Sequence, residues 1–293
     1  MPITRRTFLK GTFATTFGLS AAGAGTLYYA HTIEPNWFDT TYQQFALPRL
    51  SKAFHGYRMV QISDIHADDT FMVAGRLANL VETINTLQAD IVVITGDFVT
   101  SYRPDLKATL SHLSDLRTKD GVFGVLGNHD HPSGIEWIRA CLQAGHVQEL
   151  DNKTYTLHRG DEMLHIVGLD DLWPSNYGTP ASIWTHLPLL NQLTAALPEN
   201  GAAILLVHEP DFADVAAYNK RIDLQLSGHS HGGQVRIPFH GPLILPALSH
   251  KYPKGLYSVG NMLLYTNSGL GMLPPQFRFA CRPEIAVMDL TAT

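Results

Sequence analysis

The chain has 293 residues, 45% of them hydrophobic and 16% charged, so it can bury a large core in one or two domains. Its formal net charge of −5 excludes the strongly basic field that drives nucleic-acid binding, and we expect no nucleic-acid-binding surface. Two cysteines, Cys141 and Cys281, are too few for a disulfide framework. We expect two buried free thiols, with one disulfide left open if the protein is exported.

The N-terminus carries a targeting pattern. A moderately apolar stretch from Gly11 to Ala30 follows the charged start Thr4-Arg5-Arg6-Thr7-Phe8-Leu9-Lys10. Paired arginines before Phe-Leu-Lys resemble a twin-arginine export signal, which is an address read by a receptor. We therefore expect export by the twin-arginine machinery, to the periplasm or to the outer face of the cytoplasmic membrane or cell wall.

Cleavage of this signal stays open. Ala22-Gly23-Ala24 and Ser20-Ala21-Ala22 both have the small-x-small spacing of a cleavage site. The 20 residues from Gly11 to Ala30 are also long enough to span a bilayer as a retained anchor, which would associate the protein with the membrane. We assign residues 1–30 to the signal or anchor, 31–53 to a linker and 54–293 to a catalytic domain.

From Phe54 onward, short apolar runs alternate with amphipathic segments. Continuous apolar runs predict buried strands, and spacings of three and four predict helices. In the first half, predicted strands alternate with predicted helices, which implies parallel pairing with helices on the sheet faces. The strands are 57–63, 90–95 and 121–126, and the helices are 73–88, 106–117 and 134–144. The second half is richer in strands, with one helix near 211–218: 153–158, 163–168, 202–207, 222–227, 234–237, 255–259, 262–266 and 285–290. We expect two sheets packed together in one domain.

Five of the predicted strands end in carboxylate, amide or imidazole side chains. In chain order these are Asp64 and His66; Asp97; Asn128, His129 and Asp130; His208; and His229 and His231. Parallel α/β sheets bind ligands at the carboxyl ends of their strands. In an extended chain, residues i and i+2 point to the same side, so Asp64 and His66 can share a site, as can His229 and His231.

These donors suit divalent Mn, Fe, Zn, Ni or Co. Two such ions close together need a bridging anion, and the Asp97 carboxylate fits that role. Gly96 and Gly127 permit close approach of the backbone beside it.

The same blocks resemble those of the calcineurin-like metallophosphoesterase superfamily, from about Tyr57 to Leu290: Asp64-x-His66, Gly96-Asp97, Gly127-Asn128-His129-Asp130, His208 and Gly228-His229-x-His231. The likeness is closer to exported single-domain members, often phosphodiesterases of the cell envelope. The resemblance implies an α/β fold with four layers, α/β/β/α, built from two mixed sheets. It also implies two ions, bridged by Asp97.

The resemblance further implies a division of the ligands. One ion would be held by Asp64, His66, Asp97 and His231, and the other by Asp97, Asn128, His208 and His229. A hydroxide bridging the ions would attack phosphorus. His129 would stabilise the transition state and protonate the leaving group. Asp130 would orient His129, or else cap a helix.

One departure narrows the activity. Protein phosphatases of this superfamily extend the second block with another acid and an arginine, whereas this chain reads Gly96-Asp97-Phe98-Val99-Thr100-Ser101. This argues against a protein phosphatase and leaves the partner that orients His129 unidentified.

We therefore expect a binuclear phosphodiesterase that acts on a cell-envelope or lipid-linked phosphoester. The alternatives are a broad-specificity phosphomonoesterase and, in a different class, a non-catalytic protein that binds metal or cell wall. Two apolar segments rich in Gly and Pro, Phe239–Lys254 and Gly269–Phe277, are either plain packed loops or a platform at the site's mouth for a lipid or for the membrane surface.

Overall fold

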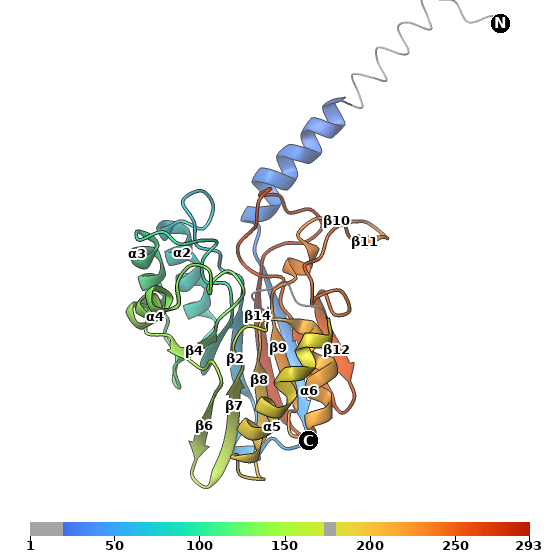
Figure 1. The fold of residues 1–293 in the computed structure, drawn as a ribbon. Helices are drawn as coiled ribbons and strands as arrows, with labels where there is room; N and C mark the ends of the chain where they lie inside the picture. The colour runs from blue at the N-terminus through green and yellow to red at the C-terminus, as the bar shows by residue number, and fades with distance from the viewer. Residues whose placement is uncertain (1–19, 173–179) are drawn as a thin grey trace, which may run out of the picture.

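A computed structural model of the chain describes residues 20–172 and 180–293. Two six-stranded mixed sheets face each other, and helices cover both outer faces, so the predicted four-layer sandwich is confirmed (Figure 1). The first sheet contains, in spatial order, β1 (Asp39–Leu47), β14 (Glu284–Ala292), β2 (Tyr57–Ile62), β3 (Ile91–Thr95), β4 (Val122–Val125) and β5 (Gln148–Glu149). The second contains β12 (Gly255–Val259), β13 (Met262–Thr266), β9 (Leu224–Ser227), β8 (Ala202–Leu206), β7 (Glu162–Gly168) and β6 (Lys153–Arg159).

The central strands are apolar throughout because both of their faces are buried. In β3, Ile91 and Val93 pack between the two sheets, whereas Val92 and Ile94 pack beneath helices. Strands β2 to β5 run parallel to one another, as do β7, β8, β9 and β13, so the carboxyl ends of the parallel strands in each sheet share one edge. This arrangement places the polar residues that follow them together.

Helices α2 (Ala74–Thr86), α3 (Leu106–Ser111) and α4 (Ile135–Ala144) pack on the first sheet. Helices α5 (Leu187–Ala195), which was not predicted, and α6 (Ala213–Asn219) pack on the second. The helix predicted over 106–117 is shorter, because its last turn tightens into a 3-10 turn. The short turns are η1 (Tyr29–Ile33), η2 (Glu34–Asn36), η3 (Lys52–Phe54), η4 (His112–Asp115), η5 (Pro180–His186), η6 (Pro210–Phe212) and η7 (His231–Gly233).

The linker predicted over residues 31–53 is wrong. Residues 39–47 form β1, which pairs in parallel with β14 and buries Phe45 and Leu47 between the sheets. Before it, η1 and η2 pack on the domain, with Glu34 buried. The folded domain therefore begins well before residue 54. The pairing is possible because the C-terminal strand β14 offers an open edge far along the sequence.

A second correction concerns residues 234–237, predicted as a strand of the main sheets. Arg236–Ile237 forms β10, which pairs only with β11 (Gly241–Pro242) in a separate hairpin. Cys141 and Cys281 are buried free thiols, as predicted. The paired arginines and residues 11–19 lie outside the described residues, so the export signal stays a prediction. Within the described ranges, no helix has the length and apolar character needed to cross a bilayer.

Candidate metal centre

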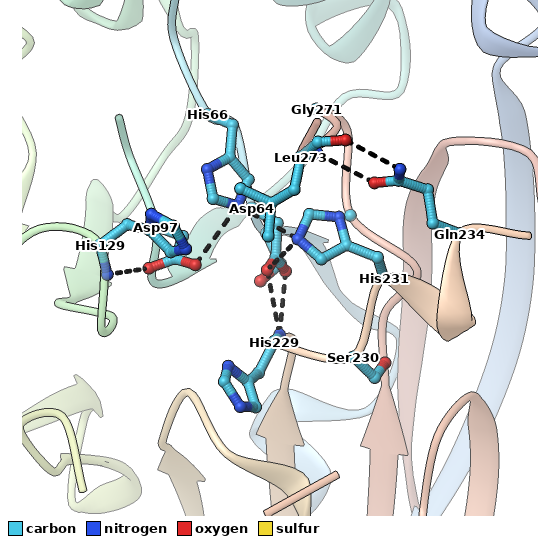
Figure 2. A network of polar contacts seen from close by, with 12 residues as sticks. Asp64, His66, Asp97, His129, His229, Ser230, His231, Gln234, Gly271 and Leu273 are labelled. Carbon is cyan, nitrogen blue, oxygen red and sulfur yellow. Dashed lines mark hydrogen bonds and ion pairs between the residues drawn. The ribbon is translucent and has the colours of Figure 1, made fainter. Parts of the chain in front are cut away.

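All seven predicted metal ligands lie at the carboxyl ends of strands from the two sheets. Asp64 and His66 follow β2, Asp97 follows β3 and Asn128 follows β4 in the first sheet, while His208 follows β8 and His229 and His231 follow β9 in the second. Six are buried and Asn128 is half-buried. Several of these side chains point toward one another in Figure 2, as the strand-end argument predicted.

Four of them form a compact group that could hold a metal ion. The donor atoms of Asp64, His66, Asp97 and His231 all lie within 4.8 Å of one another. His66 Nε2 lies 3.3 Å from Asp97 Oδ2, and His231 Nε2 lies 3.3 Å from Asp64 Oδ1. This is the set that the resemblance assigns to one ion.

The remaining ligands lie on the other side of Asp97. His208 Nε2 is 3.2 Å from Asp97 Oδ2, so this oxygen lies close to one imidazole from each predicted ion site. Asn128 is flanked by Gly127, whose backbone lies against the Asp97 carboxylate, and by His129, whose backbone amide donates to Asp97 Oδ1 at 2.9 Å. Asp97 therefore occupies a position from which it can bridge.

Backbone carbonyls fix two of the imidazole rings. His208 Nδ1 lies 2.7 Å from the Thr95 carbonyl, and His229 Nε2 lies 2.8 Å from the Ala247 carbonyl. A carbonyl only accepts hydrogen bonds, so each of these nitrogens carries a hydrogen, and the other ring nitrogen is the one that can bind a metal ion. Such outer contacts orient metal-binding histidines.

The donor set fits divalent cations. Buried polar atoms are normally paired, yet three in this cluster have no hydrogen-bond partner within the described part of the chain: His66 Nδ1, His231 Nδ1 and Asn128 Oδ1. His66 Nε2 and His231 Nε2 are 3.1 Å apart, and at most one hydrogen fits between them. Lone pairs gathered around two carboxylates are the arrangement that a cation neutralises.

The electrostatics separate the histidines. Burial alone would lower the pKa of His208, but the Asp97 carboxylate raises it well above its ordinary value. Burial, with a contribution from nearby His208, lowers the pKa of His229 to about 3, so this ring is neutral and can donate a lone pair. Burial also lowers the pKa of His231 well below its ordinary value. Burial alone would raise the pKa of Asp97, but His208 and His66 hold it well below its usual range. Asp97 is therefore an anion.

The backbone at the site differs from the extended geometry assumed in the sequence argument. Asp64, His66, Asp97, His229 and His231 all have positive φ, between 46° and 66°. This left-handed conformation is unfavourable for residues with a side chain, at a cost on the order of 1 kcal/mol each. The i, i+2 explanation is therefore wrong, although each pair does share one site.

Long-range bonds hold these residues in place. Asp64 N donates to the Gly96 carbonyl and His66 N to the Asp97 carbonyl, both at 3.0 Å. A side chain at Gly96 would collide with the ring of His208, and one at Gly127 would collide with the Asp97 carboxylate. Glycine is thus required at both positions, as the sequence predicted.

His129 lies beside the metal ligands. Its ring meets that of His66 edge-on, with centroids 4.9 Å apart. Its Nδ1 lies 3.0 Å from the Thr100 carbonyl, which is the orienting partner that the sequence left unidentified. A backbone carbonyl could not be recognised from residue type.

Neither role predicted for Asp130 matches the structure. Its buried carboxylate accepts from the amides of Phe98 and Gly127, both at 2.9 Å, and of Val99 at 3.3 Å. Helix α4 begins after Gly134, so Asp130 does not cap it. Asp130 instead braces the loops that carry Asp97 and Asn128.

A buried arginine behind the site was missed by the sequence argument. Arg278 is fully buried, and its guanidinium donates to the carbonyls of Ser268, Gly269, Gly271 and Cys281 at 2.6–3.1 Å. The segment of residues 268–271 that Arg278 binds also contacts Asp64, because Gly271 N donates to the Asp64 carbonyl at 2.7 Å. Arg278 thus supports the backbone of Asp64.

Gln234, three residues after His231, fastens this part of the chain to the predicted mouth segment Gly269–Phe277. Its side chain donates to the carbonyl of Leu273 and accepts from the amide of Leu273, both at 2.9 Å (Figure 2). It also donates to the Pro275 carbonyl at 3.1 Å. A lone glutamine gives no sequence signal for this role.

Comparisons with known proteins agree with this geometry. The family model described as calcineurin-like phosphoesterase matches residues 57–233. The chain is 35% identical over 298 aligned positions to uncharacterized metallophosphoesterase YkuE of Bacillus subtilis, covering 99% of each chain. It is 28% identical to phosphodiesterase YaeI of Escherichia coli, covering 98% of this chain and 99% of that one. It is 27% identical to UDP-2,3-diacylglucosamine pyrophosphatase LpxG of Chlamydia trachomatis, covering 92% and 94%.

Proposed function

The chain belongs to the calcineurin-like phosphoesterase family, and on that premise we propose that it is a binuclear metal-dependent phosphodiesterase acting on a cell-envelope or lipid-linked phosphoester. One observation carries the binuclear part. Asp97 Oδ2 lies 3.3 Å from His66 Nε2 and 3.2 Å from His208 Nε2, between two sets of donors.

The proposed division follows the geometry. Asp64, His66, Asp97 and His231 would hold one ion, and Asp97, Asn128, His208 and His229 the other. When bound, two such ions supply a water nucleophile at neutral pH and neutralise charge on the phosphoryl oxygens. The two predicted mouth segments border this site through Gln234 and Ala247.

His129 is the non-ligand group proposed to act on substrate. The Thr100 carbonyl accepts from Nδ1, which leaves Nε2 to face the substrate, and Nε2 donates to a phosphoryl oxygen or leaving group when both ring nitrogens carry a hydrogen. Such proton donation contributes ~10²–10⁴-fold to a rate. Asp130 has no place in the proposed chemistry, because its carboxylate bonds backbone amides.

The substrate class is proposed from two relatives and the site's mouth. YaeI is named a phosphodiesterase, and LpxG is named for a diacylated nucleotide sugar. Several side chains in Phe239–Lys254 are apolar and exposed, which suits a lipid-linked ester. Export by the twin-arginine route, to the periplasm or the outer face of the membrane, is part of the proposal and rests on Arg5 and Arg6.

The test is an ester panel. The purified protein, loaded with Mn²⁺ and in parallel with Zn²⁺, is assayed on bis-(p-nitrophenyl) phosphate, on p-nitrophenyl phosphate and on a lipid pyrophosphate. We expect faster hydrolysis of the diester than of the monoester, abolished by a chelator. A preference for the monoester would favour a phosphomonoesterase, and no turnover with any divalent metal would favour a non-catalytic binding protein.

A further inference from the structure

The β10–β11 hairpin and the residues that follow it expose apolar side chains. Phe239 is fully exposed, Ile244 is 81% exposed and Leu243 is 55% exposed. Phe239 and Ile244 are the most exposed large hydrophobic side chains in the described part of the chain. Several such side chains within one short segment mark an interaction surface, whereas single exposed ones do not.

The charge around the hairpin is opposite to that of the rest of the chain. From Leu224 to Pro283 the sequence has no Asp or Glu but has five basic residues: Arg236, Lys251, Lys254, Arg278 and Arg282. This segment therefore has a formal charge of +5, while the remainder has 16 basic and 26 acidic residues and is −10. Arg278 is buried, and Lys251 and Arg282 pair with Asp214 and Asp39. Within the described ranges, Arg236 and Lys254 make no ion pair with a carboxylate. An anionic surface is complementary to such a segment.

The hairpin lies at the same end of the molecule as the N-terminal helix of residues 20–28 (Figure 1). That helix is the described part of the apolar stretch Gly11–Ala30 and exposes Leu27 and Tyr28. It enters the domain through η1, where the Ala30 carbonyl accepts from Arg278 N at 2.8 Å. A bilayer engaged by the apolar stretch would therefore also face the hairpin.

The hairpin is joined directly to the metal centre. Val235 pairs with Phe279 between His231 and the hairpin, and Gln234 fastens this segment to Leu273. After the hairpin, the Ala247 carbonyl holds the ring of His229. The exposed apolar side chains thus lie on a segment whose two ends both reach ligands.

We propose that residues 237–244 contact an anionic lipid bilayer and seat the mouth of the metal centre against it. The apolar tip enters the interface, as amphipathic surface segments do, and the basic side chains of Arg236 and Lys254 face the lipid phosphates. This inference rests on the proposed function and deepens it, because it names how a lipid-linked ester would reach the site.

A fluorescent label tests the contact without depending on catalysis. Phe239→Cys in the full chain is labelled with an environment-sensitive thiol dye and mixed with phosphatidylglycerol vesicles or phosphatidylcholine vesicles. The control is Tyr218→Cys, an exposed aromatic on α6, which lies away from the hairpin in Figure 1. Cys141 and Cys281 are buried, and the unmodified chain gives the blank.

We expect emission to rise on phosphatidylglycerol at 239 but not at 218, to be quenched by brominated lipid, and to rise less on phosphatidylcholine. A label at 239 that stays in water, even where the chain sediments with the vesicles, overturns the contact. An equal response on both lipids overturns the electrostatic part.

A second readout tests the seating. In the double variant Phe239→Ser with Ile244→Ser, hydrolysis of a nitrophenyl phosphodiester lipid in vesicles should fall by at least ~10-fold, because each buried apolar side chain contributes that much to partitioning. Hydrolysis of soluble bis-(p-nitrophenyl) phosphate should stay unchanged. Equal rates on the vesicle substrate overturn the seating. A wild-type chain inactive on the soluble diester contradicts the proposed function instead, and the label still reports the contact.

Discussion

Replacing Arg278 by Met should lower both the stability of the fold and the metal affinity of the site. The guanidinium is fully buried, and Nη1 and Nη2 donate to four backbone carbonyls. Burial lowers the pKa of Arg278, yet the group stays charged because its ordinary value is so high. Methionine has a similar length and no donor, so the carbonyls would be left buried.

The size of the effect follows from those bonds. An unsatisfied buried polar group costs ~1–3 kcal/mol. The costs for the four carbonyls do not simply add, because all four share one guanidinium. We expect a loss of ~3–6 kcal/mol in the free energy of unfolding, or a Tm about 10 °C lower. Metal affinity should fall as well, because Gly271, which Arg278 binds, donates its amide to the carbonyl of the metal ligand Asp64.

The assay is thermal unfolding and metal titration of the wild type, Arg278→Met and Arg278→Lys. Lysine keeps three donors and should recover part of both losses. Arg139→Met is the matched control, because Arg139 is exposed and only pairs with Glu136 and Glu149. An Arg278→Met protein with wild-type Tm and wild-type metal affinity would show that Arg278 does not support the metal centre.

Three further predictions concern single residues. His129→Ala should lower kcat by ~10²–10⁴-fold with metal content unchanged, measured by diester turnover and metal analysis; an unchanged kcat would remove His129 from the chemistry. Gly127→Ala should abolish tight metal binding, since its Cβ would collide with the Asp97 carboxylate; wild-type affinity by calorimetry would contradict this. Burial raises the pKa of Asp151 to about 8, above its unfolded value, so its contribution to stability is full below pH ~4 and is lost as pH rises toward 8. Relative to Asp151→Asn, the wild type should therefore lose ~2–5 kcal/mol between pH 5 and 9 in urea unfolding, and a difference independent of pH would disprove the assignment.

The candidate site was predictable because it depends on local rules. Central strands with two buried faces read as continuous apolar runs, as in Ile91–Thr95, and the next polar residue then falls at the sheet edge. The helix at 187–195 and the strand at 39–47 were not predicted. In β1 only Phe45 and Leu47 are buried, while Tyr42 and Gln44 are exposed, so the period-two pattern is short and polar.

The parts that were missed depend on contacts between distant residues. Left-handed backbone at Asp64 and His66 is set by bonds to Gly96 and Asp97, which no local preference encodes. Arg278 likewise supports Asp64 through Gly271, although Asp64 lies more than 200 positions earlier in the chain. Propensity and periodicity describe neighbours in sequence, so such support becomes visible only in the folded chain.

If Asp97 joins two ion sites, its removal should change how many ions the protein binds, and a count of bound ions measures this. The metal-free protein is titrated with Mn²⁺, and bound ions per chain are counted by elemental analysis for the wild type and Asp97→Asn. We predict two ions per wild-type chain. In the variant we predict that tight binding at both sites and diester hydrolysis are lost. A wild type that saturates at one ion, or an Asp97→Asn protein that keeps two ions and full activity, would contradict this prediction.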